Sequence, residues 1–176
     1  NTLTHEMIDK IEIYLKAILK NKNIHMVIFK GEGEKAFCAG GDVKSFYNEK
    51  IREKNQLRRS FFYREYKLSY FIKKYKKPII SFVNGICMGG GVGIAMHSKI
   101  TIVSENVTFA MPETAIGLFP DVGAGKILSK LDHNIGFFLG LTGKRLKSSD
   151  LIEVKLANYC IAKENFNEVE NSLSKI

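Results

Sequence analysis

Three short segments of this chain contain the residue types best suited to chemistry. Residues 39–42 (Ala-Gly-Gly-Asp) and 89–91 (three glycines) form turns after strand-like apolar runs, and residues 111–121 begin with Met-Pro-Glu and end with Pro-Asp. Because glycine lacks a side chain, the backbone N–H groups of such turns can approach a ligand closely. Two N–H donors that converge on one oxygen, with carboxylates nearby, form the arrangement that acyl chemistry on a carbonyl requires. The sequence therefore predicts an enzyme core that acts on an acyl thioester.

The length and composition predict one globular domain over residues 1–176. The chain is 45% hydrophobic and long enough for a hydrophobic core. No apolar run approaches the roughly 18 residues of a membrane helix, so we expect no membrane partner. Residues 1–20 resemble an amphipathic helix, and no targeting segment is recognised in the chain. The three cysteines are scattered and odd in number, which favours free thiols in a reducing compartment. No cysteine or histidine spacing supports a metal site.

Positive charge is concentrated in one stretch. The chain carries a net charge of +9, and residues 50–77 contain eleven Lys or Arg but two Asp or Glu. Such a stretch favours a polyanionic partner, such as a phosphate-rich cofactor or nucleic acid. A solvated helix face is the alternative. Lys44 and this stretch are candidates for contacts with cofactor phosphates.

Alternating apolar patterns predict an α/β protein with mainly parallel strands. Phe62, Tyr66 and Tyr70 recur at helical spacing, and we expect them in the core rather than in contact with a cofactor. Helices are expected over residues 4–20, 42–76, 89–96, 122–131, 134–141, from Ser148 or Ser149 to Ala157, and 164–176. Strands are expected over residues 25–29, 79–83, 100–103, 108–110 and 159–161, with residues 36–38 leading into the first glycine turn.

Several familiar motifs fail on inspection. A dinucleotide fingerprint that starts at Gly89 would need glycine or alanine where Ile94 stands. The two Gly-Lys pairs are not followed by Ser or Thr, which excludes a P-loop, and no GxSxG nucleophile elbow occurs. The four histidines fit no nucleophile or metal pattern, and we expect each at the surface or at a helix end.

Taken together, residues 35–42, 84–91 and 111–113 resemble the crotonase (enoyl-CoA hydratase/isomerase) superfamily in order and spacing. The resemblance extends from about residue 1 to residue 165. It implies a ββα superhelix core. It also implies that the first strand and the C-terminal helices of that fold lie outside this chain, which would be truncated at both ends.

Within the superfamily, residues 109–123 and 141–147 are most similar to 3-hydroxyisobutyryl-CoA hydrolases. Hydratases carry a glutamate where this chain has Gly93, and they usually carry glycine where it has Asp121. The resemblance thus implies hydrolysis of a short 3-hydroxyacyl-CoA, 3-hydroxyisobutyryl-CoA first and 3-hydroxypropionyl-CoA next, to the free acid and CoA. It implies no cofactor, because CoA is part of the substrate, and a mitochondrial role in valine catabolism; without it we would expect a cytoplasmic protein. The protein could be a monomer or a homo-oligomer.

The same resemblance assigns roles to individual residues. The N–H groups of Gly41 and Gly90 would form an oxyanion hole for the thioester carbonyl. Glu113 would be the general base or the nucleophile. Asp121 would bind the substrate hydroxyl or assist proton transfer, and Glu65 would bind the acyl end. The remaining expected substrate-binding residues are Ala39, Gly40, Asp42 and Gly89.

Each polar assignment has a structural alternative. Glu113 and Asp121 both follow a proline, so either could stabilise a helix N-terminus. Glu65 could be a surface ion-pair partner of Arg64 or a lysine. Asp42 could fix the turn without touching substrate.

Two other functions remain as alternatives. One is hydration or isomerisation of an enoyl-CoA. The other is a non-catalytic RNA-binding protein on the same fold, because residues 50–77 interleave basic and aromatic side chains. We do not expect nucleic acid as the partner, since the helical spacing of those aromatics favours core packing.

Overall fold

The structure is a computed structural model that describes residues 1–42 and 51–175, apart from the side chains of residues 51–55 and 57. Its strands form two parallel sheets, one ordered β1-β3-β5-β7 and the other β2-β4-β6. The first sheet contains β1 (Val27–Lys30), β3 (Ile79–Val83), β5 (Ile100–Val103) and β7 (Tyr159–Cys160). The second contains β2 (Ala36–Cys38), β4 (Ile86–Met88) and β6 (Thr108–Ala110).

Successive strands alternate between the two sheets, and helices separate the pairs. The order is β1, β2 and α3 (Ile51–Lys73), then β3, β4 and α4 (Gly90–His97), then β5 and β6. Each β-β-α unit therefore adds one strand to each sheet and one helix beside them. This path confirms the expected α/β fold with a ββα superhelix core.

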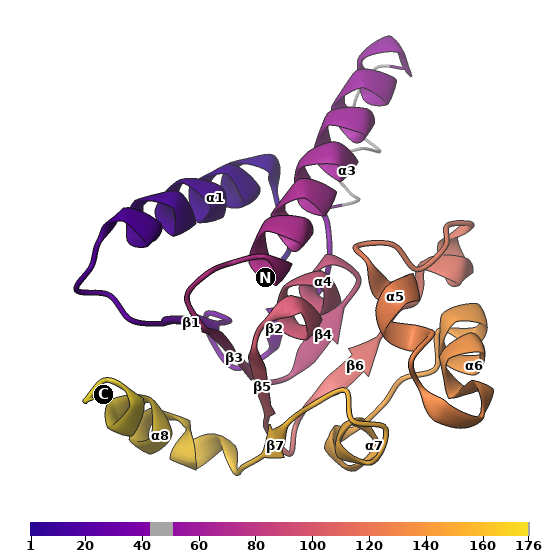
Figure 1. Cartoon of the computed structure of the whole chain (residues 1–176). Coiled ribbons are helices and arrows are strands. Elements are labelled where there is room, and N and C mark those ends of the chain that lie inside the picture. The colour runs from indigo at the N-terminus through magenta and orange to yellow at the C-terminus, as the bar shows by residue number, and fades with distance from the viewer. Residues whose placement is uncertain (43–50, 176) are drawn as a thin grey trace.

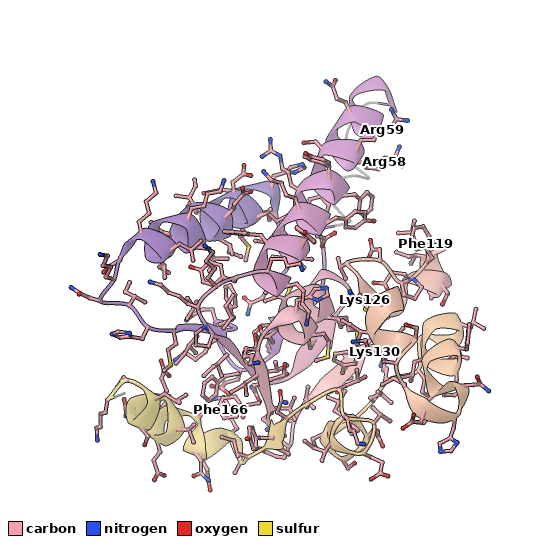
Figure 2. All side chains as sticks on the ribbon, in the orientation of Figure 1. Arg58, Arg59, Phe119, Lys126, Lys130 and Phe166 are labelled. Carbon is pink, nitrogen blue, oxygen red and sulfur yellow. The ribbon has the colours of Figure 1, made fainter. Side chains whose placement is uncertain are left out.

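Two long helices cover one side of the larger sheet, and α8 (Phe166–Leu173) lies on the other (Figure 1). Strand β3 separates two clusters of apolar side chains, because alternate residues point to opposite faces. Ile79 and Val83 join the main core with α1 (His5–Lys20), α3 and α4. Ile80 and Phe82 face α8, where the Phe82 and Phe166 rings lie 5.1 Å apart (Figure 2).

Helix α3 packs on α1 and extends beyond the strands, with Arg58 and Arg59 near its outer end (Figures 1 and 2). The expected helix over residues 42–76 is confirmed for Ile51–Lys73, while residues 43–50, Lys44 among them, lie outside the described residues. Within the described part, no helix is both long and apolar enough to span a bilayer.

The prediction that the aromatic stripe of α3 enters the core is wrong for two of its three residues. Tyr66 is 39% exposed and Tyr70 is 66% exposed, whereas Phe62 is half-buried and packs against the main core. The buried stripe lies one position away and includes Phe61, Leu68 and Ile72. Helical spacing shows that a stripe of residues shares one face, but not which stripe is buried. The buried stripe contains a polar residue, so its pattern looks less apolar than that of the aromatic stripe.

Several expected boundaries also change. Strand β4 (Ile86–Met88) is not among the expected strands. Neither Ser148 nor Ser149 caps α7: Lys147 is the N-cap, and its N–H donates to the Asp150 carboxylate at 2.8 Å. The remaining short elements are η1 (Glu113–Ile116), α5 (Ala124–Leu128), η2 (Asp132–Asn134), α6 (Ile135–Thr142), α7 (Ser148–Glu153) and η3 (Lys163–Asn165).

Candidate active site

A cavity of about 230 Å³ opens where the two glycine turns meet. Its apolar lining comes from α3, β4 and the segment around η1. Of the nine residues that the sequence predicts for the site, eight line this cavity: Ala39, Gly40, Gly41, Glu65, Gly89, Gly90, Glu113 and Asp121. The structure therefore brings these residues together, while their individual roles stay predictions.

Parallel pairing of β2 with β4 brings the two turns together. Cys38 lies opposite Cys87 in the register, so the turns that follow these strands leave the same edge of the sheet. A methyl group placed on Gly40 would lie 3.7 Å from the Gly90 nitrogen. Gly40 and Gly89 have φ values of 101° and 51°, a backbone region that favours glycine.

The amides of Gly41 and Gly90, one in each turn, donate to no backbone acceptor among the described residues. Gly90 is the first residue of α4, where N–H groups have no intrahelical partner and the helix dipole adds partial positive charge. Leu3 bonds to the residues on either side of Gly41: its N–H donates to the Gly40 carbonyl at 2.8 Å, and its carbonyl accepts from the Asp42 N–H at 2.9 Å. The Gly41 and Gly90 amides can therefore both donate to a ligand.

Three carboxylates and no basic side chain face the cavity among the described residues. Burial, followed by the negative charges of Asp121 and Glu113, raises the pKa of Glu65 to about 8. Burial also raises the pKa of Glu113 to about 7, against a backbone hydrogen bond that lowers it, and the charge of Asp121 adds to the increase. Near pH 7 the cavity can therefore hold both carboxylic acids and carboxylates, the condition for proton exchange with a ligand.

Glu113 sits directly between β6 and the cavity. Glu113 is the first residue of η1, so it does lie at a helix start, as the structural alternative expected. It is nevertheless only 7% exposed and lines the cavity. Its Oε1 lies 3.0 Å from where a methyl group on Gly89 would be, beside the second glycine turn. Its Oε2 is buried without a hydrogen-bond partner within the described part of the chain. A buried, unpartnered carboxylate oxygen is available to a bound ligand.

Glu65 belongs to the buried stripe of α3. The surface ion-pair alternative is wrong, because Arg64 pairs with Asp9 of α1 while Glu65 is 4% exposed and faces the cavity. Its Oε1 is buried and lacks a hydrogen-bond partner among the residues described. A methyl group on Gly90 would lie 2.1 Å from that oxygen, so Glu65 packs directly against the second turn.

Asp121 is held by a residue that sequence reasoning placed in the core. The Tyr66 hydroxyl donates to the Asp121 carboxylate at 2.7 Å. Burial raises the pKa of Asp121, and this hydrogen bond opposes the increase. The helix-cap alternative is wrong, because Gly123 is the N-cap of α5 and no side chain caps that helix. Fifty-five residues separate Tyr66 from Asp121, and no local pattern in the sequence connects them.

The position where hydratases carry a glutamate is closed in this chain. A methyl group on Gly93 would lie 2.8 Å from the Val122 Cβ and 3.0 Å from the Ser69 Oγ. All three residues are buried. A second carboxylate could not enter here without displacing the backbone that follows Asp121.

Asp42 is not among the cavity-lining residues that the structure describes, and its proposed contact with substrate stays a prediction. Sequence reasoning missed the apolar wall of the cavity, whose residues come from three elements: Phe61, Phe62, Met88, Ala115, Ile116 and Leu118. Within the described residues, no group of three or more His, Cys, Asp or Glu side chains could hold a metal ion.

The chain is similar over nearly its whole length to curated 3-hydroxyisobutyryl-CoA hydrolases. The mitochondrial 3-hydroxyisobutyryl-CoA hydrolase of Danio rerio is 45% identical over 98% of this chain, and that of Homo sapiens is 41% identical over 98%. The probable 3-hydroxyisobutyryl-CoA hydrolase 3 of Arabidopsis thaliana is 40% identical over 100%. This chain spans 45%, 45% and 46% of those three proteins, about half the length of the curated relatives that it matches.

Solved structures support the fold. The crystal structure of an enoyl-CoA hydratase from Rhodobacter sphaeroides has a TM-score of 0.93 and 34% identity, and it covers 98% of this chain and 51% of its own. A carnitinyl-CoA dehydratase from Mycobacterium thermoresistibile gives a TM-score of 0.92 at 33% identity, over 98% of this chain and 50% of its own. The family model described as enoyl-CoA hydratase/isomerase matches residues 1–176. The chain therefore belongs to the enoyl-CoA hydratase/isomerase family.

Proposed function

We propose that this chain carries the acyl site of a 3-hydroxyacyl-CoA thioester hydrolase, with 3-hydroxyisobutyryl-CoA as the substrate and residues 1–176 as one domain. The observation that carries the proposal is the position of Glu113, which faces a small apolar cavity beside the Gly41 and Gly90 amides, neither of which has a backbone acceptor among the described residues. The relatives that are 40–45% identical bear the name of this hydrolase, which supports the choice of substrate.

The thioester carbonyl oxygen would accept hydrogen bonds from the Gly41 and Gly90 amides. As a nucleophile adds to the carbonyl carbon, negative charge develops on that oxygen, and in known enzymes one such donor contributes roughly 3–4 kcal/mol. The start of α4 adds partial positive charge at Gly90. Collapse of the addition product breaks the C–S bond and releases CoA.

Glu113 would supply the nucleophile in one of two ways. As a general base it would take a proton from water while the water oxygen bonds to the carbonyl carbon. As a nucleophile it would bond to that carbon itself and give a mixed anhydride, which water then hydrolyses. Both routes need the ionised side chain, and a pKa of about 7 leaves enough of it near neutral pH.

Asp121 and Glu65 would bind the acyl end of the substrate. The Tyr66 hydrogen bond directs one Asp121 oxygen, so the carboxylate can accept a further hydrogen bond from a substrate hydroxyl. Glu65, with its pKa of about 8, is protonated near pH 7 and can donate one. A donor and an acceptor in one apolar cavity suit a short hydroxyacyl group.

Hydration of an enoyl-CoA is the alternative that the site opposes. The second carboxylate of hydratases has no space at Gly93, where Val122 and Ser69 fill the volume. The names of the relatives compared also point to acyl-CoA enzymes rather than to RNA binding, and Arg64 and Lys67 of the basic stretch are already paired with acids of α1.

The proposal is tested with Glu113→Gln, which keeps the shape of the side chain and removes its base. We expect kcat for 3-hydroxyisobutyryl-CoA to fall on the order of 10²–10⁴-fold, with little change in the affinity for the CoA ester. Glu32→Gln, at an exposed position outside the cavity, is the matched control and should leave kcat unchanged. Full turnover by Glu113→Gln, or a wild-type protein that prefers crotonyl-CoA, would contradict the proposal.

We further propose a mitochondrial location, which the names of the vertebrate relatives support. CoA would enter as part of the substrate, and the chemistry described above needs no other cofactor. The oligomeric state is tested by measuring the mass of the protein in solution.

A further inference from the structure

The residue after Asp121 has an unusual backbone conformation. Val122 has a φ of 43°, in the left-handed region that β-branched residues avoid. Its side chain is 3% exposed and packs against Gly93 of α4. Such a conformation is energetically unfavourable and persists where surrounding contacts enforce it.

His97, the last residue of α4, makes the contact that can enforce it. Its Nε2 lies 2.7 Å from the Val122 carbonyl oxygen. A carbonyl oxygen can accept but cannot donate, so Nε2 carries the hydrogen and donates it. Burial lowers the pKa of His97, the bond to Val122 opposes that decrease, and the positive charges of Lys73 and Lys126 lower it further. The ring is therefore neutral near pH 7, in the tautomer protonated at Nε2.

The backbone also approaches the His97 ring closely at Gly123. Gly123 has a φ of 82°, and a methyl group there would lie 2.8 Å from the His97 Nε2. The backbone of residues 122 and 123 thus turns tightly around the His97 imidazole ring. Asp121 is the residue that this turn delivers into the cavity.

We propose that His97 is a positioning residue that holds the 121–123 turn and thereby sets the direction of the Asp121 carboxylate. This inference rests on the proposed role of Asp121 in binding or proton transfer. Two helices then fix that carboxylate: Tyr66 of α3 bonds to its oxygen, and His97 of α4 bonds to the adjoining backbone. Because Gly90 begins the same α4, this one helix sets the oxyanion donor and the Asp121 turn relative to each other.

Two amide substitutions at His97, made in the complete protein, test the hydrogen bond. Gln places its side-chain N–H₂ at about the reach of Nε2, whereas Asn places its own at the reach of Nδ1. We expect His97→Asn to lower kcat/KM at least tenfold and His97→Gln to restore most of the loss. His133→Asn, at an exposed residue that also has a positive φ, should leave kcat/KM unchanged. Equal activity of His97→Asn and wild type would overturn the proposal.

A double-mutant cycle distinguishes positioning from a general structural role. If His97 acts through Asp121, adding His97→Asn to Asp121→Asn should cause no further loss of kcat/KM. A further tenfold loss in that background would overturn the proposal, because His97 would then act independently of Asp121. The proposed function fails separately, if Glu113→Gln keeps full turnover.

A second measurement keeps the proposal testable if His97→Asn does not fold. The ¹⁵N signals of the His97 ring in the wild-type protein report which nitrogen carries the hydrogen. At neutral pH we expect a protonated Nε2 and an unprotonated Nδ1. The opposite tautomer could not donate to the Val122 carbonyl and would overturn the proposal.

Discussion

The acidic side chains of this protein occupy two contrasting environments. On the surface between α1 and α3, Asp9 pairs with Arg64, and Glu12 pairs with Lys16 and Lys67. In the cavity, Glu65, Glu113 and Asp121 face one another, and no cation lines that cavity among the described residues. The protein carries a net charge of +9, so a shortage of basic residues does not explain the difference.

The contrast appears in the pKa values. Hydrogen bonds to Lys16 and Lys67 lower the pKa of Glu12, whereas burial and neighbouring carboxylates raise the pKa of Glu65 to about 8. Surface carboxylates therefore stay ionised and contribute modestly to stability. Glu65 and Glu113 gain and lose protons near neutral pH, at some cost to stability, which is typical of groups that exchange protons with a substrate. The same residue type thus serves different purposes in the two regions.

Replacing Glu65 with Gln should give the largest change in stability. The folded protein holds the Glu65 proton up to about pH 8, while the unfolded chain releases it above about pH 4.5. Between these values the unfolded state binds fewer protons, so Glu65 makes the wild-type free energy of unfolding fall as pH rises. Denaturant unfolding should show Glu65→Gln gaining up to a few kcal/mol over wild type from pH 4.5 to pH 8. A difference that does not vary with pH would contradict the raised pKa.

A smaller effect is expected on the pH profile of the reaction. Because the proposed mechanism requires an ionised Glu113, kcat/KM should rise with pH through about 7. Asp121→Asn removes a negative charge that helps to raise the pKa of Glu113. The rising limb should therefore move to lower pH, by less than one unit, whatever activity remains. The same midpoint in both proteins would show that Asp121 does not interact electrostatically with Glu113.

The smallest effect is expected at the surface. The folded-state pKa of Glu12 is lowered, so its contribution to stability is present above the unfolded pKa of about 4.5 and disappears as pH falls through the folded value. Glu12→Gln should cost less than about 1 kcal/mol at pH 7, because the two lysines that pair with Glu12 are exposed to solvent and such pairs contribute little. Its unfolding free energy should approach that of wild type in acid, and added salt should reduce the difference at pH 7. A loss as large as the effect at Glu65 would remove the distinction between the two regions.

Local patterns in the sequence were enough to predict an α/β fold with parallel strands, the two glycine turns and the acidic segment, because each of these depends on neighbouring residues. The resemblance to a known family supplied the ββα superhelix and the site assignments, Glu65 among them, and eight of the nine site residues line one cavity. Contacts between distant elements could not be predicted. Tyr66 was assigned to the core because its spacing is helical, yet it bonds to Asp121, and nothing near His97 points to Val122. The orientation of α3 decides the first of these contacts, and the shape of one turn decides the second.

The close contact between Gly90 and Glu65 also limits which mutations the gene can tolerate. Every missense change at codon 90 adds at least one carbon atom, and that atom would lie 2.1 Å from a buried Glu65 oxygen. At Gly125 of α5, by contrast, an added carbon atom would have no neighbour within 4 Å. Among alleles in a natural population, codon 125 is free to drift, whereas changes at codon 90 should be eliminated by selection.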